Sequence, residues 1–530
     1  SSRAPSPSGG RHPRVRAGEM HAMTAARYLL ALLAARSLQC ATARLPWLHA
    51  QRKGLDLHAR ADDALEEREV SRRQLPCRNL VEKAPVKFPK ELLLGKPLTN
   101  FGMHSGYVNV TEQDYLFYWL VEAHEKVARD APLVLWSNGG PGCSGMEGAT
   151  TEHGPYVLHD VKENNMMFTG RLAHNPYSWN TRAHVLYVDQ PRYVGFSCGT
   201  GPKVTSSRDA GKDMVQFLLG WRRLFPEHRH RSIIFASESY GGHYVPAWTA
   251  AVMDYNEKAS DPIPLKGIAL GNAVVDAEVQ NLDAFITFQK RHGLIPEEAD
   301  PKTDEEARDA MQRHLGYAPN YYHYGLADVQ CCGCYSYNYS TWGEWMSRRD
   351  VNEALNVCGE AGKNTFGGCQ GGCMAGLDDF DAHDTFDYRG ALERALESGI
   401  KLTMFYGMMD TACDYVGGYK LAMSLRWPGS RHFREAALAP LHIGGSLAGA
   451  TQSGAGLTWL QIQSAGHMVA EDNPAAASFA MDTLVLQVAM PKETLSEVAE
   501  SLLEGAPAGP ELPLGRCTLL ALAGCLLAAA

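Results

Sequence analysis

The most constraining feature of this sequence is a serine placed between an apolar run and two glycines, in Ser232-Ile-Ile-Phe-Ala-Ser-Glu-Ser-Tyr-Gly-Gly242. The run predicts a buried strand, and the residues after it predict a tight turn and then a helix, with Ser239 at the apex of the turn. This arrangement, a nucleophile elbow, is strained and closes only where small residues flank the serine. The usual pattern is Gly-x-Ser-x-Gly; here Ser237 holds the first glycine place and Gly241 the second.

Further short apolar runs recur along the chain between segments of helical periodicity, which cover 208–225, 244–255 and 475–488. Continuous apolar runs are typical of strands that are buried on both faces of a mostly parallel sheet. Strands that alternate with helices predict the α/β class, and with the elbow they predict an α/β-hydrolase fold with a mostly parallel central sheet flanked by helices. The predicted strands are Pro132–Trp136, His184–Val188, Ser232–Ala236, Gly267–Leu270, Lys401–Phe405 and Trp459–Ile462.

The two ends of the chain differ in amino-acid composition from its middle. Residues 20–43 have the positive start, apolar run and small-residue end of a secretory signal peptide, preceded at 1–19 by upstream or disordered sequence. Residues 44–76 are charged and Arg-rich, as in a linker or propeptide. The α/β-hydrolase domain is expected over 77–490. The tail, 491–530, is either a lipid-anchor signal or an apolar end without a role.

The long gap between the strands at 270 and 401 predicts a lid insertion at about 277–390. Six of the thirteen cysteines crowd into it, and behind a signal peptide this predicts a disulfide-stapled lid, although in a reducing compartment the same crowding would suggest zinc. Two sequons, at Asn109 and Asn338, predict glycosylation in the same compartment. The crowded cysteines are Cys331, Cys332, Cys334, Cys358, Cys369 and Cys373.

A serine becomes a good nucleophile only beside a base that an acid orients. In hydrolases of the expected fold the three groups occur in the order Ser, acid, His. Asp410 comes shortly after the predicted strand that ends at Phe405, and His467 shortly after the one that ends at Ile462. Both therefore lie past the carboxyl ends of strands, the edge at which α/β active sites are assembled. We expect Ser239, Asp410 and His467 to be catalytic.

A glycine-rich segment, Trp136-Ser-Asn-Gly-Gly-Pro-Gly-Cys143, follows another predicted strand. Successive glycines let backbone N–H groups turn toward a ligand, although such a run is in isolation often a plain turn. We expect the N–H groups of Gly140 and Tyr240 to form an oxyanion hole for the tetrahedral intermediate.

These segments together resemble the serine carboxypeptidase family, which includes vacuolar carboxypeptidases and the lysosomal protective protein. The resemblance runs from about Phe101 to Pro474, with its motifs in the right order. They are the glycine-rich segment, Glu152-His-Gly-Pro155, Asn175-Pro-Tyr-Ser-Trp-Asn180, Asp189-Gln-Pro191 with Gly195-Phe-Ser197, Glu238-Ser-Tyr-Gly-Gly-His-Tyr-Val-Pro246, Gly271-Asn272, Asp410-x-x-Cys413 and Gly466-His-Met-Val469.

The resemblance implies that Ser239 is the nucleophile, His467 the base and Asp410 its orienter. It also implies that a substrate carboxylate is bound by Asn138, Glu152 and Glu238. Two adjacent glutamates that share a proton can donate to a carboxylate at low pH and repel it once that proton leaves, so an acidic working compartment follows. By resemblance the pocket includes Trp136, Gly139, Cys413 and Met468; a disulfide is the alternative for Cys413.

Several residues depart from the family pattern, and they bear on substrate preference more than on activity. Ser237 replaces the glycine that is most common at the first position of the elbow, and Tyr193 replaces another usual glycine. The remaining departures are Ala273, Met408-Met409, Asp414 and Ala470.

The sequence therefore predicts a serine-type carboxypeptidase of the secretory pathway that acts through an acyl-enzyme at acidic pH, in a lysosome, a vacuole or outside the cell. No metal or other cofactor is implied. The substrates are peptide or protein C-termini; a membrane is a partner only if the tail is an anchor signal, and a homodimer stays open. A net charge of −9 and a pI near 6.1 argue against nucleic acid. Two alternatives remain: an acyltransferase or esterase with the same triad, and an idle protein that protects partner enzymes.

Overall fold

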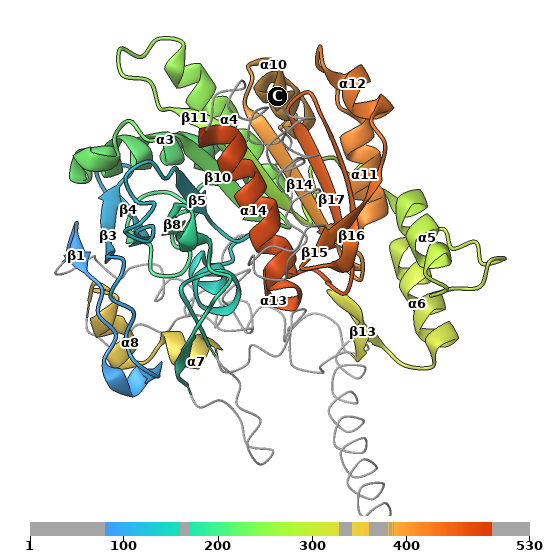
Figure 1. Ribbon diagram of the computed structural model, residues 1–530, viewed down its shortest axis with the longest axis horizontal. Coiled ribbons are helices and arrows are strands. Elements are labelled where there is room, and N and C mark those ends of the chain that lie inside the picture. The colour runs from blue at the N-terminus through green and yellow to red at the C-terminus, as the bar shows by residue number, and fades with distance from the viewer. Residues whose placement is uncertain are drawn as a thin grey trace, which may run out of the picture. The chain divides into compact units, whose positions relative to one another are not determined.

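The computed structural model describes residues 80–158, 170–327, 342–359, 380, 384 and 386–489 (Figure 1). The segments 1–19, 20–43 and 44–76, the tail and Asn338 lie outside the described residues. So do five of the six crowded cysteines, so the stapled lid stays a prediction. The sixth, Cys358, is buried, and its sulfur lies 3.7 Å from that of Cys198, which is disulfide-bonded.

The central sheet has twelve strands within the described residues, in the order β1-β3-β4-β8-β5-β10-β11-β14-β17-β16-β15, with β9 beside β4. Its middle is parallel and consists of β8 (His184–Val188), β5 (Leu133–Trp136), β10 (Ile233–Glu238), β11 (Leu265–Gly271), β14 (Lys401–Gly407) and β17 (Leu457–Ile462). These are the six predicted strands. The outer strands pair antiparallel: β1 (Ala84–Pro85), β3 (Met103–Asn109), β4 (Asp114–Val121), β9 (Cys198–Gly199), β16 (Ser446–Gly454) and β15 (Ala439–Ile443).

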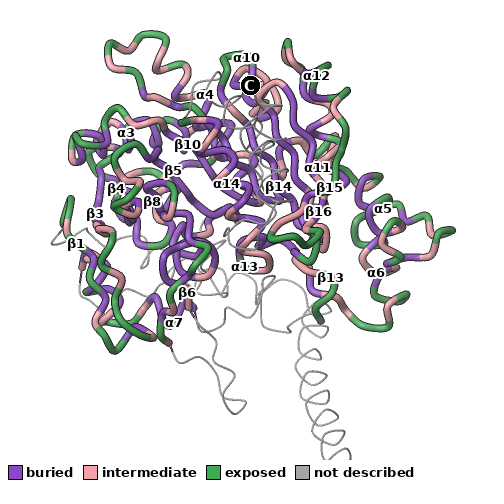
Figure 2. The backbone as a smooth tube through the Cα atoms, in the orientation of Figure 1, coloured by how far each residue is buried: buried purple, intermediate pink, exposed green. Residues whose placement is uncertain are grey.

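Helices cover both faces of this sheet, as predicted. On one face, α3 (Ser207–Leu224), α4 (Gly241–Asn256) and α10 (Tyr388–Glu397) pack on side chains such as Phe235. On the other face, α14 (Pro474–Ala489) covers the sheet (Figure 1). It packs there on side chains such as Ile234. Neighbouring residues of a strand point to opposite faces of the sheet, and helices cover both faces. Every position of β10 is therefore buried, which explains its unbroken apolar run (Figure 2).

The other described elements surround the sheet. A small sheet contains β2 (Leu93–Leu94), β7 (Leu172–His174) and β6 (Tyr156–Leu158). The region of the expected insertion contributes α5 (Leu282–Arg291), α6 (Asp304–Leu315), the hairpin of β12 (Pro319–Asn320) and β13 (His323–Ala327), α7 (Trp342–Met346) and α8 (Arg349–Ala354). Near the C-terminal end lie α11 (Tyr415–Ser424), α12 (Ser430–Glu435) and α13 (Val469–Asp472). None of the helices in the described part of the chain has the length and apolar character needed to span a membrane.

Candidate active site

Ser239 lies at the apex of a tight turn between β10 and α4. Its φ angle is +58°, in the left-handed region that residues with a side chain seldom occupy, and such a conformation costs roughly 1–3 kcal/mol. The turn is held from both sides, because the Ser239 N–H donates to the carbonyl oxygen of Gly271 and the Val274 N–H donates to that of Ser239, each at 3.0 Å. The predicted elbow is therefore present in its strained geometry.

Small residues around the elbow are required by its packing. A Cβ added to Gly241 would collide with the side chain of Ser237, and one added to Gly242 would collide with the backbone of Val274. Ser237 itself is fully buried, and its hydroxyl donates to the carbonyl oxygen of Ser137 at 2.5 Å. The serine that replaces the usual glycine is thus accommodated because its hydroxyl finds a backbone acceptor.

Asp410 and His467 come together past the ends of β14 and β17. The Nδ1 atom of His467 donates to Oδ2 of Asp410 at 2.7 Å, and both side chains are buried. The ring of Tyr322, in the turn of the β12–β13 hairpin, stacks on the His467 ring with centroids 4.3 Å apart. The carbonyl oxygen of Tyr322 also accepts from the His467 N–H at 2.8 Å. This hairpin therefore fixes the orientation of the histidine.

Cys413 connects the elbow with the Asp410–His467 pair. Its thiol shares a hydrogen bond with the side chain of Ser239, and its backbone N–H donates to Oδ2 of Asp410 at 3.2 Å. It is a free thiol, so the alternative of a disulfide for Cys413 is wrong. Burial, helped by the negative charges of Asp410 and Asp414, raises the pKa of this thiol well above its usual value.

Sequence reasoning assigned no role to Asn272, which orients Asp410. Its Nδ2 donates to Oδ2 of Asp410 at 2.8 Å, and its Oδ1 accepts from the backbone N–H of Gly407 at 2.9 Å. Asn272 is buried and has a φ of +37°. The Gly271-Asn272 pair was visible only as a family motif, because a partner 138 positions away leaves no local signal.

The side chains of Asp410, Cys413 and His467 offer ligand atoms within 4.8 Å of one another, as a metal site would. Their chemistry argues against that use. Nδ1 of His467 is already engaged by Asp410, and a zinc ligand would have to be a thiolate, whereas the raised pKa of Cys413 favours the thiol. The cluster fits an acid–base pair better than a metal centre.

The glycine-rich segment after β5 lies directly against the elbow. Gly139 has no room for a Cβ, which would collide with the backbone of Glu238 and Tyr240. Gly140 has a φ of +112°, and within the described residues its N–H donates to no acceptor. Tyr240 follows the serine and immediately precedes α4. This close approach is what the predicted pair of oxyanion donors, Gly140 and Tyr240, requires.

Two buried glutamates meet at one asparagine beside the elbow. Nδ2 of Asn138 donates to Oε1 of Glu238 at 2.9 Å and to Oε1 of Glu152 at 3.2 Å. The other side of the amide is fixed by Trp136, whose Nε1 donates to Oδ1 of Asn138 at 2.7 Å. The structure therefore brings together the three residues expected to bind a carboxylate, with the predicted pocket residue Trp136 behind them.

The protonation of these glutamates is strongly perturbed. Burial, followed by the charge of Glu147, raises the pKa of Glu152 to about 8. Burial, followed by the charges of Glu152 and Glu147, raises the pKa of Glu238 well above its usual value. The two carboxyl groups are also hydrogen-bonded to each other, so the pair holds a proton at acidic and neutral pH. Glu147, also buried, is a third acid that sequence reasoning missed.

The remaining predicted residues have simpler surroundings. Met468 is buried next to His467, and Asn109 is exposed at the end of β3, where a sugar could be attached. Tyr193, which departs from the family pattern, takes the conformation expected of a glycine, with a φ of +73°. Its hydroxyl donates to Oδ1 of Asp114 at 2.8 Å.

The sequence profile of the serine carboxypeptidase family matches residues 93–323 and 317–487. Similar proteins include carboxypeptidase Y homolog A of Fusarium vanettenii, which is 28% identical over 415 residues, covering 71% of this chain and 72% of the relative. Serine carboxypeptidase-like 48 of Arabidopsis thaliana is 28% identical over 477 residues, covering 82% and 88%. Pheromone-processing carboxypeptidase kex1 of Neosartorya fischeri is 29% identical over 414 residues, covering 70% and 63%.

A solved structure shares the fold. The prohormone-processing carboxypeptidase Kex1 from Saccharomyces cerevisiae superimposes with a TM-score of 0.61 at 23% identity, and the match covers 76% of this chain and 95% of that one. The predicted fold class, an α/β-hydrolase fold with a mostly parallel central sheet flanked by helices, is confirmed.

Proposed function

The chain belongs to the serine carboxypeptidase family, and from this premise we propose that Ser239, His467 and Asp410 carry out its reaction. The protein is a serine-type carboxypeptidase, a hydrolase that acts on peptides. Three observations support these three residues: the strained turn at Ser239, the 2.7 Å hydrogen bond of His467 with Asp410, and the position of Cys413 between them. The Cys413 thiol shares a hydrogen bond with Ser239, and its backbone N–H donates to Asp410.

In the proposed reaction, Nε2 of His467 takes the proton of the Ser239 hydroxyl while the serine oxygen bonds to the last peptide carbonyl carbon. The oxyanion that forms is stabilised by the N–H groups of Gly140 and Tyr240. The intermediate collapses when His467 returns the proton to the leaving nitrogen, which releases the C-terminal amino acid. A water molecule, deprotonated by His467, then cleaves the acyl-enzyme, and Ser239 recovers its proton.

The observation that carries the substrate assignment is the Asn138–Glu152–Glu238 cluster. While the two glutamates retain a proton, the protonated carboxyl group can donate a hydrogen bond to the free carboxylate of a peptide C-terminus. Asn138, whose amide nitrogen donates to both glutamates in the free protein, can turn one of these hydrogen bonds to the same carboxylate. Once the cluster has lost that proton, the negative charge repels the same carboxylate. We therefore assign the protein an exopeptidase specificity with an acidic working range, for which the pKa of about 8 at Glu152 leaves a wide margin.

The acidic working range supports a place in the secretory pathway, and it favours a lysosome or vacuole over the extracellular space. The signal-like segment at 20–43 and the exposed sequon at Asn109 support the same route. The acyltransferase or esterase and the idle protective protein are less consistent with this cluster, which suits a substrate that ends in a free carboxylate.

Release of leucine from benzyloxycarbonyl-Phe-Leu between pH 4 and 8 tests this function. The wild type is expected to release leucine with an acidic optimum, and Ser239→Ala is expected to release none. The matched substrate with a C-terminal amide should stay intact. Equal cleavage of the acid and the amide would overturn the carboxylate assignment. Labelling of the wild type by a fluorophosphonate without any leucine release would move the function to acyl transfer or ester hydrolysis.

A further inference from the structure

A buried carboxylate, that of Asp384, gathers polar groups from three helices behind the elbow. Its side chain is fully buried. At the start of α3, the Ser207 hydroxyl donates to Oδ2 at 2.6 Å and the Ser207 N–H donates to Oδ1 at 2.8 Å. At the start of α10, the Tyr388 hydroxyl donates to Oδ1. Burial alone would raise the pKa of Asp384, but hydrogen bonds from His243, Ser207 and Tyr388 hold it below its usual value.

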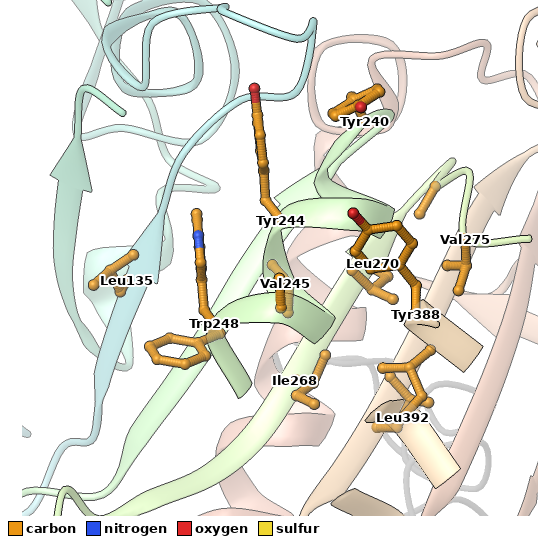
Figure 3. Close-up of a cluster of buried hydrophobic side chains, with 14 of the residues drawn as sticks. Leu135, Tyr240, Tyr244, Val245, Trp248, Ile268, Leu270, Val275, Tyr388 and Leu392 are labelled. Atoms are coloured by element: carbon orange, nitrogen blue, oxygen red, sulfur yellow. The ribbon is translucent and has the colours of Figure 1, made fainter. Parts of the chain in front are cut away.

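The elbow is tied to the same carboxylate through Tyr240. The Tyr240 hydroxyl donates to Oδ2 of Asp384 at 2.8 Å, and Nδ1 of His243, in the first turn of α4, lies 3.3 Å from the same oxygen. Figure 3 shows Tyr240 at the start of α4 and Tyr388 on α10, with the apolar side chains of the core packed beside them. The hydroxyl end of the Tyr240 side chain is thus fixed by Asp384.

This anchor matters because of what the backbone of Tyr240 does. Its N–H is one of the two proposed oxyanion donors, and it follows a serine held in a strained conformation. Strained backbone persists only where the surrounding structure over-determines it. Backbone hydrogen bonds of Ser239 hold the turn, and the carbonyl oxygen of Tyr240 accepts from the N–H groups of His243 and Tyr244 in the first turn of α4. The Tyr240 phenol adds a side-chain restraint on the same residue, whose N–H is the proposed donor.

We propose that Asp384 is a positioning residue of the reaction: it fixes the Tyr240 side chain and thereby aims the Tyr240 N–H at the developing oxyanion. The inference rests on the proposed role of Ser239 and goes beyond it. Asp384 does not contact the substrate. Its effect is on the transition state, so it acts on kcat and leaves substrate binding unchanged.

Tyr240→Phe, which removes only the hydroxyl, is the main test in the full-length chain. It is expected to lower kcat for benzyloxycarbonyl-Phe-Leu roughly tenfold, less than the loss of an entire oxyanion donor, with KM within twofold. Tyr388→Phe is the matched control, since it removes a second phenol from the same carboxylate but lies outside the elbow. It should lower the unfolding temperature while kcat stays within twofold.

Asp384→Asn, alone and combined with Tyr240→Phe, completes a double-mutant cycle. If both residues act through one contact, Asp384→Asn/Tyr240→Phe should be no slower than the slower of the two single variants. If the double variant instead loses kcat by the product of the two single losses, the inference is overturned. A Tyr240→Phe variant whose kcat is unchanged would overturn it as well. If Asp384→Asn does not fold, the Tyr240→Phe and Tyr388→Phe pair decides alone.

The rate of labelling by a fluorophosphonate separates this inference from the proposed function. The reagent needs the nucleophile and the oxyanion donors but no peptide, so it reports on the elbow even if wild-type enzyme releases no leucine. Slower labelling of Tyr240→Phe, but not of Tyr388→Phe, would support the positioning role while the peptidase assignment failed. Equal labelling rates would overturn the positioning role whatever the substrate is.

Discussion

Asn272 donates to Oδ2 of Asp410 at 2.8 Å, and this is the same oxygen that accepts from Nδ1 of His467. The two donors thus fix the direction of one carboxylate oxygen. In the proposed mechanism the orientation of Asp410 determines that of His467, so Asn272 acts on the proposed base through one intermediate residue.

Replacement of Asn272 by glycine is expected to lower kcat by about tenfold with little change in KM, because a misdirected Asp410 orients His467 less well. Glycine tolerates the positive φ of this position, so backbone strain does not confuse the result. Asn356→Gly is the matched control, since Asn356 is also an asparagine with positive φ, at +55°. Its Nδ2 donates to Pro85 and Ser105, on the outer strands β1 and β3, and not to Asp410. An Asn272→Gly variant with normal kcat would contradict the expectation.

The pH dependence of KM should follow the glutamate pair. Because Glu152 and Glu238 have raised pKa values, the pair stays protonated through acidic pH, and KM should be flat there. As pH rises past the pKa of the pair, KM should increase by about tenfold per unit. Glu152→Gln, which has no proton to lose, should show a weaker increase. Steady-state kinetics from pH 4 to 9 measures both, and a wild-type KM that falls with pH would contradict the mechanism.

The same pKa shift predicts a change in stability. A carboxyl group whose pKa is higher in the folded state stabilises the fold below its unfolded pKa, and this contribution is lost as pH rises through the folded value. For Glu152 the window runs from 4.5 to about 8. The unfolding temperature of the wild type should therefore drop relative to that of Glu152→Gln across this window. Parallel curves for the two proteins would rule out the linkage.

Glu147 should act on the pair from a distance, through its charge. Since this charge helps to raise the pKa of both glutamates, Glu147→Gln should lower those pKa values. The rise in KM should then begin at lower pH than in the wild type, while KM at pH 4 stays unchanged. A KM profile displaced to higher pH would show that the charge of Glu147 does not act in this way.

Cys413 should be a poor target for alkylation near neutral pH. Iodoacetamide reacts with the thiolate, and both the burial and the raised pKa of Cys413 keep that form scarce. Activity should therefore survive exposure to iodoacetamide at pH 7 for far longer than a free thiol would last. Mass spectrometry of the treated protein locates any adduct, and Cys413→Ala is the control. Rapid inactivation with the adduct on Cys413 would contradict the expectation.

The parallel strands could be predicted because each is buried on both faces and reads as a continuous apolar run. Ile233–Glu238 and Lys401–Gly407 are examples. The antiparallel strands were not predicted. Ala439–Ile443 is partly exposed and carries no such run, whereas Asp114–Val121 is buried and apolar and was missed although it carries the same signal. Ser239, Asp410 and His467 were predicted because each follows a strand end in a fixed order.

Residues that act through another side chain could not be found in this way. The contacts of Asn272 with Asp410 and of Asp384 with Tyr240 join positions that are far apart in the sequence. The polar character of Asn272 and Asp384 is ordinary, and only the fold reveals that their partners are buried functional groups. The same holds for Glu147, whose influence is electrostatic and requires the folded distances.

The contact between Tyr322 and His467 has a consequence for how this enzyme could diversify. The proposed base is held by a hairpin that comes between β11 and β14 in the chain and belongs to a separate two-stranded sheet outside the central one. Evolution therefore cannot exchange this hairpin as an independent module. Any replacement must supply its own support for the histidine, so new substrate preferences and catalytic competence are inherited together.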